Sequence, residues 1–140
     1  MATMQVELVS PEKILFSGEA TMVVTRTLGG GDIAFQPGHA PFLAALTENH
    51  TRIHLVDGTV QDVAVHGGFV QVSDNKVSIL SDVAELAEHI DVPRAQRAKA
   101  SVEGRDAHAV DAECEAALRR AHARLLAAGG MADAPRRGAH

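Results

Sequence analysis

Hydrophobic and polar residues alternate along most of the first 90 residues of the chain. Gln5–Val9 alternates strictly, and Thr21–Thr25 is rich in β-branched residues, as half-buried strands are. Asp57-Gly58 and Asp74-Asn75 each separate two apolar stretches and predict tight hairpins, and Ser17-Gly18 predicts a further turn. Eight or more short strands with regular turns predict an antiparallel sandwich or barrel.

The pattern changes near Ile90, where helical spacing replaces alternation. Asp91 can cap a helix whose first turn holds Pro93, and Gly104 is a plausible stop. A second helix is predicted from about residues 109–111 to Gly129-Gly130. Its apolar stripe recurs at helical spacing and consists of Val110, Cys114, Ala117, Leu118, Ala121 and Leu125. Residues 131–140 lack periodicity and are predicted to be disordered.

Composition and charge narrow the class of protein. The 140 residues carry a net charge of -5, which argues against nucleic-acid binding as the main function. Residues 1–90 hold 11 acidic and 4 basic side chains, whereas residues 91–140 hold 7 acidic and 9 basic ones. A single cysteine excludes a disulfide framework and a multi-cysteine zinc site. No secretory signal or membrane-spanning segment is visible, so we expect a protein of a reducing compartment without direct membrane insertion.

Two groups of side chains are candidates for chemistry. His39, His54 and His66 would suit a small metal-dependent β-barrel enzyme, but none lies in a recognisable ligand motif, so no metal site is expected. The helical part also contains five arginines: Arg94, Arg97, Arg119, Arg120 and Arg124. Either they lie on solvated helix faces, or they come together from two facing helices and bind a polyanion. No catalytic set stands out, which indicates a protein that performs no chemistry by itself.

Three stretches resemble the epsilon subunits of F-type ATP synthases. They read LVSPEKILFSGEA in residues 8–20, GDIAFQPGHAPFLAAL in residues 31–46 and HGGFVQVSDNKVSILSDVAELAEHID in residues 66–91. The resemblance implies a mainly β plus α fold. An antiparallel β-sandwich of about ten strands would occupy residues 1–90, followed by an antiparallel two-helix hairpin in residues 91–128. Residues 129–140 would form a disordered tail.

The same resemblance implies a non-catalytic subunit of the central stalk. Such a subunit couples proton-driven rotation to ATP synthesis, binds the gamma subunit and touches the rotor ring of c subunits. Its C-terminal helices can extend into the alpha/beta catalytic head and inhibit ATP hydrolysis. It would lie at the cytoplasmic face of the plasma membrane as a peripheral part of the complex. A free-standing ATP-sensing module is the alternative.

The resemblance also assigns candidate residues. Contacts to the ring or to gamma would come from Asp32 and from the turn Pro37, Gly38, His39, Ala40 and Pro41. No cofactor is required, but ATP is implied as a regulatory ligand by a pattern that continues into the second helix. Its members are Glu85, Ile90, Asp91, Arg94, Ala95, Arg120 and Arg124. One phosphate-binding arginine of the pattern is replaced by Ser101.

Overall fold

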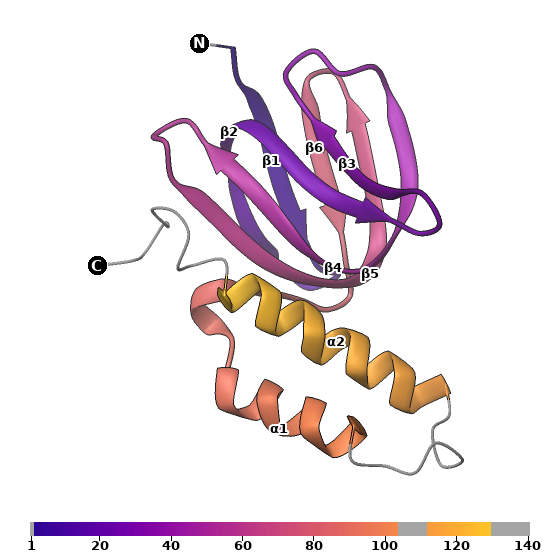
Figure 1. The fold of residues 1–140 in the computed structure, drawn as a ribbon. Coiled ribbons are helices and arrows are strands. Elements are labelled where there is room, and N and C mark those ends of the chain that lie inside the picture. The colour runs from indigo at the N-terminus through magenta and orange to yellow at the C-terminus, as the bar shows by residue number, and fades with distance from the viewer. Residues whose placement is uncertain (1, 104–111, 130–140) are drawn as a thin grey trace.

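The computed structural model describes residues 2–103 and 112–129, which form a strand-rich body followed by two helices (Figure 1). The strands of the body are β1 (Met4–Val9), β2 (Ile14–Thr27), β3 (Gly31–Phe35), β4 (Phe42–Leu55), β5 (Val60–Ser73), β6 (Lys76–Leu80) and β7 (Ala84–Leu86). A short 3-10 turn, η1 (Ala87–His89), leads to α1 (Val92–Glu103) and α2 (Ala112–Gly129). We refer to the strand-rich body as the sandwich and to the helices as the hairpin.

The sheet closes on itself through its first strand. The order is β1-β6-β5-β4-β2-β3, with β7 beside β5, and β1 also pairs with β2. Most pairings are antiparallel, as predicted, but β1 runs parallel to β6 over Gln5–Val9. Because β1 bonds to strands on both of its sides, neither of its edges is left open for other chains.

The described residues form fewer strands than the roughly ten predicted, because three of the strands are unusually long. β2, β4 and β5 each run 14 residues, more than twice an ordinary strand. The predicted turn at Ser17-Gly18 is wrong, because both residues lie within β2 and pair with β1. Gly67 and Gly68 in β5 have φ values of 83° and 117°, and a Cβ on Gly68 would lie 2.0 Å from the Leu80 carbonyl oxygen. Only glycine fits this backbone conformation and this close approach to β6, so Gly67 and Gly68 allow β5 to continue as one strand.

The core of the sandwich follows from the alternating pattern. In β1 the residues alternate between buried and half-buried, so Val6 and Leu8 point inward. They meet Phe35, Ile53, Val70 and the other members of one apolar cluster, all of which belong to β1 to β6. The cluster contains no helical residue, so the sandwich has its own core independent of the hairpin.

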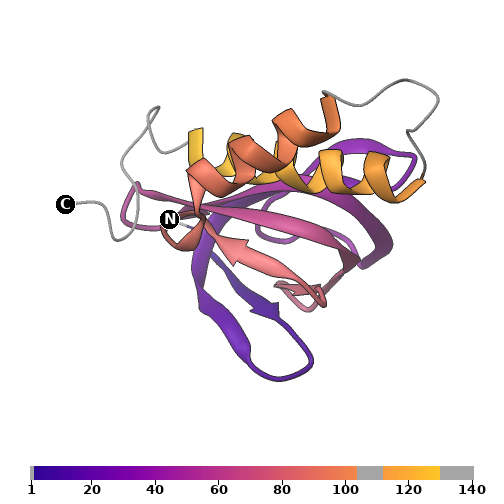
Figure 2. The same ribbon diagram turned by 90° about the horizontal axis from the view of Figure 1, so that it is seen from below.

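The hairpin lies along one side of the sandwich, with α2 between α1 and strands β4 and β5 (Figures 1 and 2). As predicted, Asp91 caps α1: its Oδ1 accepts a hydrogen bond from the Arg94 amide at 3.1 Å. Among the helical side chains that the structure describes, the buried ones are all small: Ala95, Ala121, Ala123 and Ala127. No helix in the described ranges is long and apolar enough to cross a membrane. The predicted stop at Gly104, the predicted start near residues 109–111 and the predicted tail lie outside the described residues.

Candidate functional site

The turn between β3 and β4 presents residues 37–41 on a fixed framework. Gly38 has a φ of 83°, a conformation that favours glycine, and its amide donates to Asn75 Oδ1 at 3.0 Å. The ring of His39 packs edge-on against Phe35 at a centroid distance of 5.0 Å, and Phe35 is fully buried. Gly38, Ala40 and Pro41 are exposed. The turn is thus a rigid, exposed feature suited to a partner surface.

Asp32 does not lie at this turn. It stands near the start of β3, where Arg26 on β2 donates from Nε to its Oδ1 at 2.9 Å. Pro37 is five positions further along the chain, about 16 Å away at strand spacing. The hydrogen bond from Arg26 holds the pKa of Asp32 below its ordinary value. The structure therefore separates Asp32 from the turn with which the sequence grouped it.

A carboxylate shared between the sandwich and α2 is the centre of the candidate regulatory site. Arg124 donates from Nε to Glu85 Oε1 on β7 at 2.6 Å, and His66 Nε2 on β5 lies 3.1 Å from the same oxygen. Burial alone would raise the pKa of Glu85, but Arg124 and His66 together hold it below its ordinary value. Burial lowers the pKa of His66, and the charges of Arg124 and Arg120 lower it further. His66 is accordingly neutral near pH 7 and donates to Glu85.

A second ion pair joins the same helix to β4. Arg119 donates from Nε to Glu48 Oε2 at 3.2 Å. Burial would raise the pKa of Glu48, but its own backbone amide and Arg119 keep it below the ordinary value. Glu48 stands opposite His66 in the β4–β5 register, so both ion pairs lie on the sheet face that α2 covers. Charged contacts rather than large apolar ones define this interface.

The remaining candidate residues gather at the start of α1. Asp91 also accepts through its main-chain oxygen from the Ala95 amide at 3.0 Å, and Ala95 is buried. Ile90 is half-buried, and Arg94 is exposed. The structure thus divides the predicted ATP-binding set. Glu85 and Arg124 are in contact, and the charge of Arg120 lowers the pKa of nearby His66. Ile90 and Asp91 directly precede α1, and Arg94 and Ala95 lie in its first turn.

Sequence reasoning missed two features of this region. His66 was considered only as a metal ligand, although its partner is a carboxylate, and Glu48 was not considered. The three histidines His39, His54 and His66 belong to different parts of the sandwich, and the described residues include no group of three His, Cys, Asp or Glu side chains arranged to hold a metal ion. Glu48 and His66 can be identified as cross-strand neighbours only when the register of β4 and β5 is known.

Three comparisons place this architecture among known proteins. Residues 3–87 match the family described as ATP synthase, Delta/Epsilon chain, beta-sandwich domain. The ATP synthase epsilon chain of Streptomyces coelicolor is 47% identical over 131 residues, which are 92% of this chain and 98% of that relative. The ATP synthase epsilon chain of Thermobifida fusca is 48% identical over 127 residues, 88% of this chain and 90% of the relative.

Solved structures agree on the fold. A chain of the Euglena gracilis mitochondrial ATP synthase, in a structure of OSCP/F1/c-ring, superposes with a TM-score of 0.78 at 21% identity. The superposition covers 91% of this chain and 82% of that chain. A chain from the central stalk and c-ring of the Tetrahymena thermophila enzyme gives a TM-score of 0.61, also at 21% identity, covering 89% of this chain and 96% of that one. The β-sandwich with two C-terminal helices is confirmed by these comparisons.

Proposed function

This chain belongs to the family of ATP synthase epsilon chains, and we propose that it couples proton-driven rotation to ATP synthesis and restrains ATP hydrolysis. The observation that carries the proposal is the match over nearly the whole length of an epsilon chain, hairpin included. The subunit catalyses no reaction itself. It acts as a peripheral part of the complex at the cytoplasmic face of the membrane, within the central stalk.

Two surfaces of the sandwich suit its proposed partners. Phe69 is 54% exposed and stands between Ala45 on β4 and Leu80 on β6, and Leu43 beside it is 68% exposed. Exposed apolar residues gathered on one face favour a protein partner, and we assign this face to the gamma subunit. The rigid turn at residues 37–41 is assigned to the c subunits of the rotor ring. The two contacts together would pass torque through the sandwich.

The hairpin supplies the regulatory half of the proposal. It is held to the sandwich by small side chains and ion pairs, so a second position of similar free energy is accessible to it. In that second position it would reach the alpha/beta catalytic head and block hydrolysis. ATP would favour the docked position by binding Arg94, Arg120 and Arg124, and no resident cofactor is needed.

Inhibition of hydrolysis tests the mechanical proposal. A catalytic head stripped of its own epsilon chain is combined with the full chain or with a chain ending at Ile90, and gel filtration verifies that each one binds. We expect both chains to bind and only the full chain to lower the rate of ATP hydrolysis. Failure of both chains to bind would contradict the stalk assignment, because the sandwich retains its own core in either version.

Calorimetry tests the role proposed for ATP. We expect the full chain to bind ATP and the double variant Arg94→Ala, Arg124→Ala to lose that binding. Because Arg124 also holds Glu85 against α2, a control for loosened docking is needed. The variant Glu48→Gln serves, because it weakens the ion pair of Arg119 with the sheet and lies outside the predicted ATP-binding set. If the double variant binds ATP as the original chain does, the assignment of those arginines is wrong.

A further inference from the structure

A cleft on the other flank of α2 is unused by the proposed function. It has a volume of about 1080 Å³ and lies between the hairpin and strands β2 to β4. Six basic side chains line it: Arg26, His50 and Arg52 from the sandwich, and Lys99, Arg119 and His122 from the helices. We call this the basic cleft. Arg119 and His122 lie on a different stripe of α2 from Arg120 and Arg124, which face His66 and Glu85.

The charge in the basic cleft differs from that of the chain as a whole. Its lining includes four permanently charged cations and two carboxylates, Asp32 and Glu48, on a chain whose net charge is -5. A local excess of positive charge between low-dielectric walls concentrates anions. The cations come from both the sandwich and the hairpin, so their mutual repulsion is strongest when the hairpin is docked. An anion between them would relieve that repulsion.

The two carboxylates hold their arginines loosely. Arg26 and Asp32 are 55% and 63% exposed, and Arg119 is 52% exposed. The ion pairs Arg26–Asp32 and Arg119–Glu48 are therefore hydrated, and each arginine can exchange its carboxylate for another anion. Arg52 Nε is buried and makes no hydrogen bond to any described residue, although it lies 3.5 Å from Asp62 Oδ1. That same oxygen already bonds to His50 Nε2 at 2.5 Å. Guanidinium groups with donors to spare are suited to phosphate oxygens.

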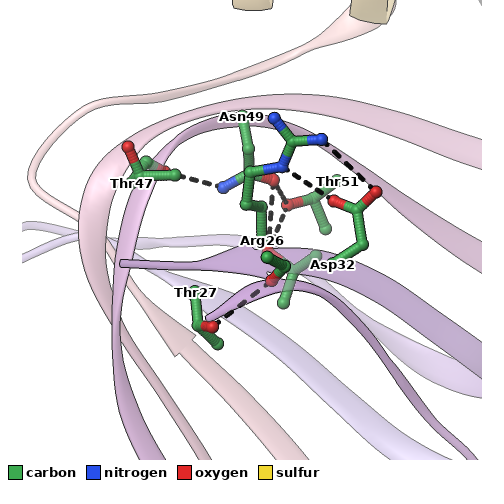
Figure 3. A network of polar contacts seen from close by, with 8 residues as sticks. Arg26, Thr27, Asp32, Thr47, Asn49 and Thr51 are labelled. Atoms are coloured by element: carbon green, nitrogen blue, oxygen red, sulfur yellow. Dashed lines mark hydrogen bonds and ion pairs between the residues drawn. The ribbon is translucent and has the colours of Figure 1, made fainter. Parts of the chain in front are cut away.

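Strand β4, which carries part of the cleft lining, is held by a buried network. Thr51 Oγ1 donates to Asn49 Oδ1 at 2.6 Å, and Asn49 Nδ2 donates to the Thr47 oxygen at 2.8 Å. Figure 3 shows this network and the side chain of Arg26 pointing toward Asp32. Leu28 and Leu126, which are 69% and 48% exposed, add apolar lining to the same cleft. Because β4 is held in this way, the backbone that carries Arg52 is fixed before a ligand arrives.

We propose that the basic cleft binds a polyphosphate group, either inorganic or carried by a nucleotide, which bridges the sandwich and the hairpin. Several cations on opposite walls match a chain of phosphates better than one isolated anion. A ligand held from both sides binds the docked hairpin better than the released one, so it favours docking. The site is separate from the Arg94, Arg120 and Arg124 set, and its existence does not depend on the proposed function.

Calorimetry on the full chain at low salt tests this site, first with inorganic tripolyphosphate and then with ATP. We expect Lys99→Gln to weaken tripolyphosphate binding about tenfold, and Lys99→Gln with Arg119→Gln to weaken it further. Arg97→Gln is the matched control: Arg97 is an exposed arginine of the same helix that lies outside the cleft lining, and its loss should change affinity less than twofold. Arg94→Ala with Arg124→Ala should leave tripolyphosphate binding in place.

The outcomes separate this site from the proposed ATP site. Loss of tripolyphosphate binding in Lys99→Gln, with the Arg97→Gln chain unchanged, supports the basic cleft whether or not ATP inhibits or regulates. In the Arg94→Ala, Arg124→Ala chain, which lacks the proposed ATP site, tighter binding of ATP than of tripolyphosphate identifies a nucleotide as the source of the phosphates, and equal binding identifies the inorganic anion. No binding of tripolyphosphate, or equal weakening by Arg97→Gln and Lys99→Gln, would overturn the proposal. Lys99→Gln alone leaves the Arg119–Glu48 pair intact, so altered docking does not confuse the result.

Discussion

The core of the sandwich and the interface beneath α2 differ in the kind of side chain that forms them. The core joins large apolar side chains such as Phe35, Leu8 and Ile53, all fully buried. Beneath α2, the buried contacts from the helix are alanines, and the sheet opposes them with Glu48, His66 and Glu85. Apolar burial stabilises in proportion to area, whereas a partly exposed ion pair contributes about 1 kcal/mol or less. The first region fixes the fold, and the second holds α2 through contacts that we expect to be weaker.

Truncation of a core residue should give the largest effect. In Phe35→Ala, we expect the free energy of unfolding to fall by about 3–5 kcal/mol, because a fully buried ring is replaced by a cavity. Denaturant unfolding followed by circular dichroism measures it. Leu28→Ala, at a site 69% exposed, is the control and should change stability by less than about 0.5 kcal/mol. Equal losses in the two variants would remove the distinction between core and surface.

Neutralising the shared carboxylate should act on the hairpin and leave the core intact. In Glu85→Gln, we expect about 1–2 kcal/mol less docking free energy, because the common acceptor of Arg124 and the buried His66 loses its negative charge. Hydrogen exchange of α2 amides should accelerate about fivefold to thirtyfold. The core amides of β1 and β5 should keep their protection. Glu115→Gln, an exposed change on α2, is the control. Parallel loss of protection in α2 and in the core would show that the two regions unfold together.

Acid should loosen the hairpin before it affects the core. The pKa of His66 is below its ordinary value of 6.5 when α2 is docked, because of burial and because of the charges of Arg124 and Arg120, while Glu85 opposes this. Glu48 stands opposite His66 in the β4–β5 register. The undocked state therefore binds more protons, and the contribution of neutral His66 is lost as pH falls through 6.5. The lowered pKa values of Glu85 and Glu48 give the same sign at lower pH, below their ordinary value of 4.5.

Hydrogen exchange of α2 between pH 5 and pH 8, corrected for the intrinsic pH dependence, measures this loosening. Protection of α2 should fall on acidification below pH 6.5, and His66→Gln should remove the part of that fall that His66 contributes. Protection that rises as the pH falls would contradict the assignment of His66 as a neutral donor to Glu85. The core of the sandwich contains no histidine, so its amides provide the internal reference over this range.

The division into strands and helices could be predicted from the sequence, because alternation and helix capping depend on residues that are close together in the chain. Alternation located the inward residues of β1, and Asp91 capped α1 as its position indicated. The strand count failed because Gly18, read as a turn, lies in a continuous strand whose direction is set by pairing with β1. A turn signal is a preference that a tertiary partner can override.

The interface could not be predicted in the same way. Glu85 and Arg124 are 39 positions apart, and nothing within either segment specifies the partner. The α2 stripe was predicted to include Ala121, which is buried, but the equally buried Ala123 and Ala127 were missed. The helix contacts both α1 and the sheet, so it buries two sides, and single-stripe periodicity describes only one.

The ion pair Arg26–Asp32 tests how solvent exposure affects the strength of an ion pair. Like Arg124–Glu85 it joins an arginine to a carboxylate, but its side chains are more exposed to water. The hydrogen bond lowers the pKa of Asp32, yet both side chains are more than half exposed, so water and salt screen the attraction. In Asp32→Asn, we expect a loss of no more than about 0.5 kcal/mol in the free energy of unfolding. Denaturant unfolding at 0.05 M and 0.5 M salt, beside Glu85→Gln, measures both pairs. A larger loss in Asp32→Asn than in Glu85→Gln would mean that exposure does not rank the ion pairs, and the hairpin would then need another source of weak docking.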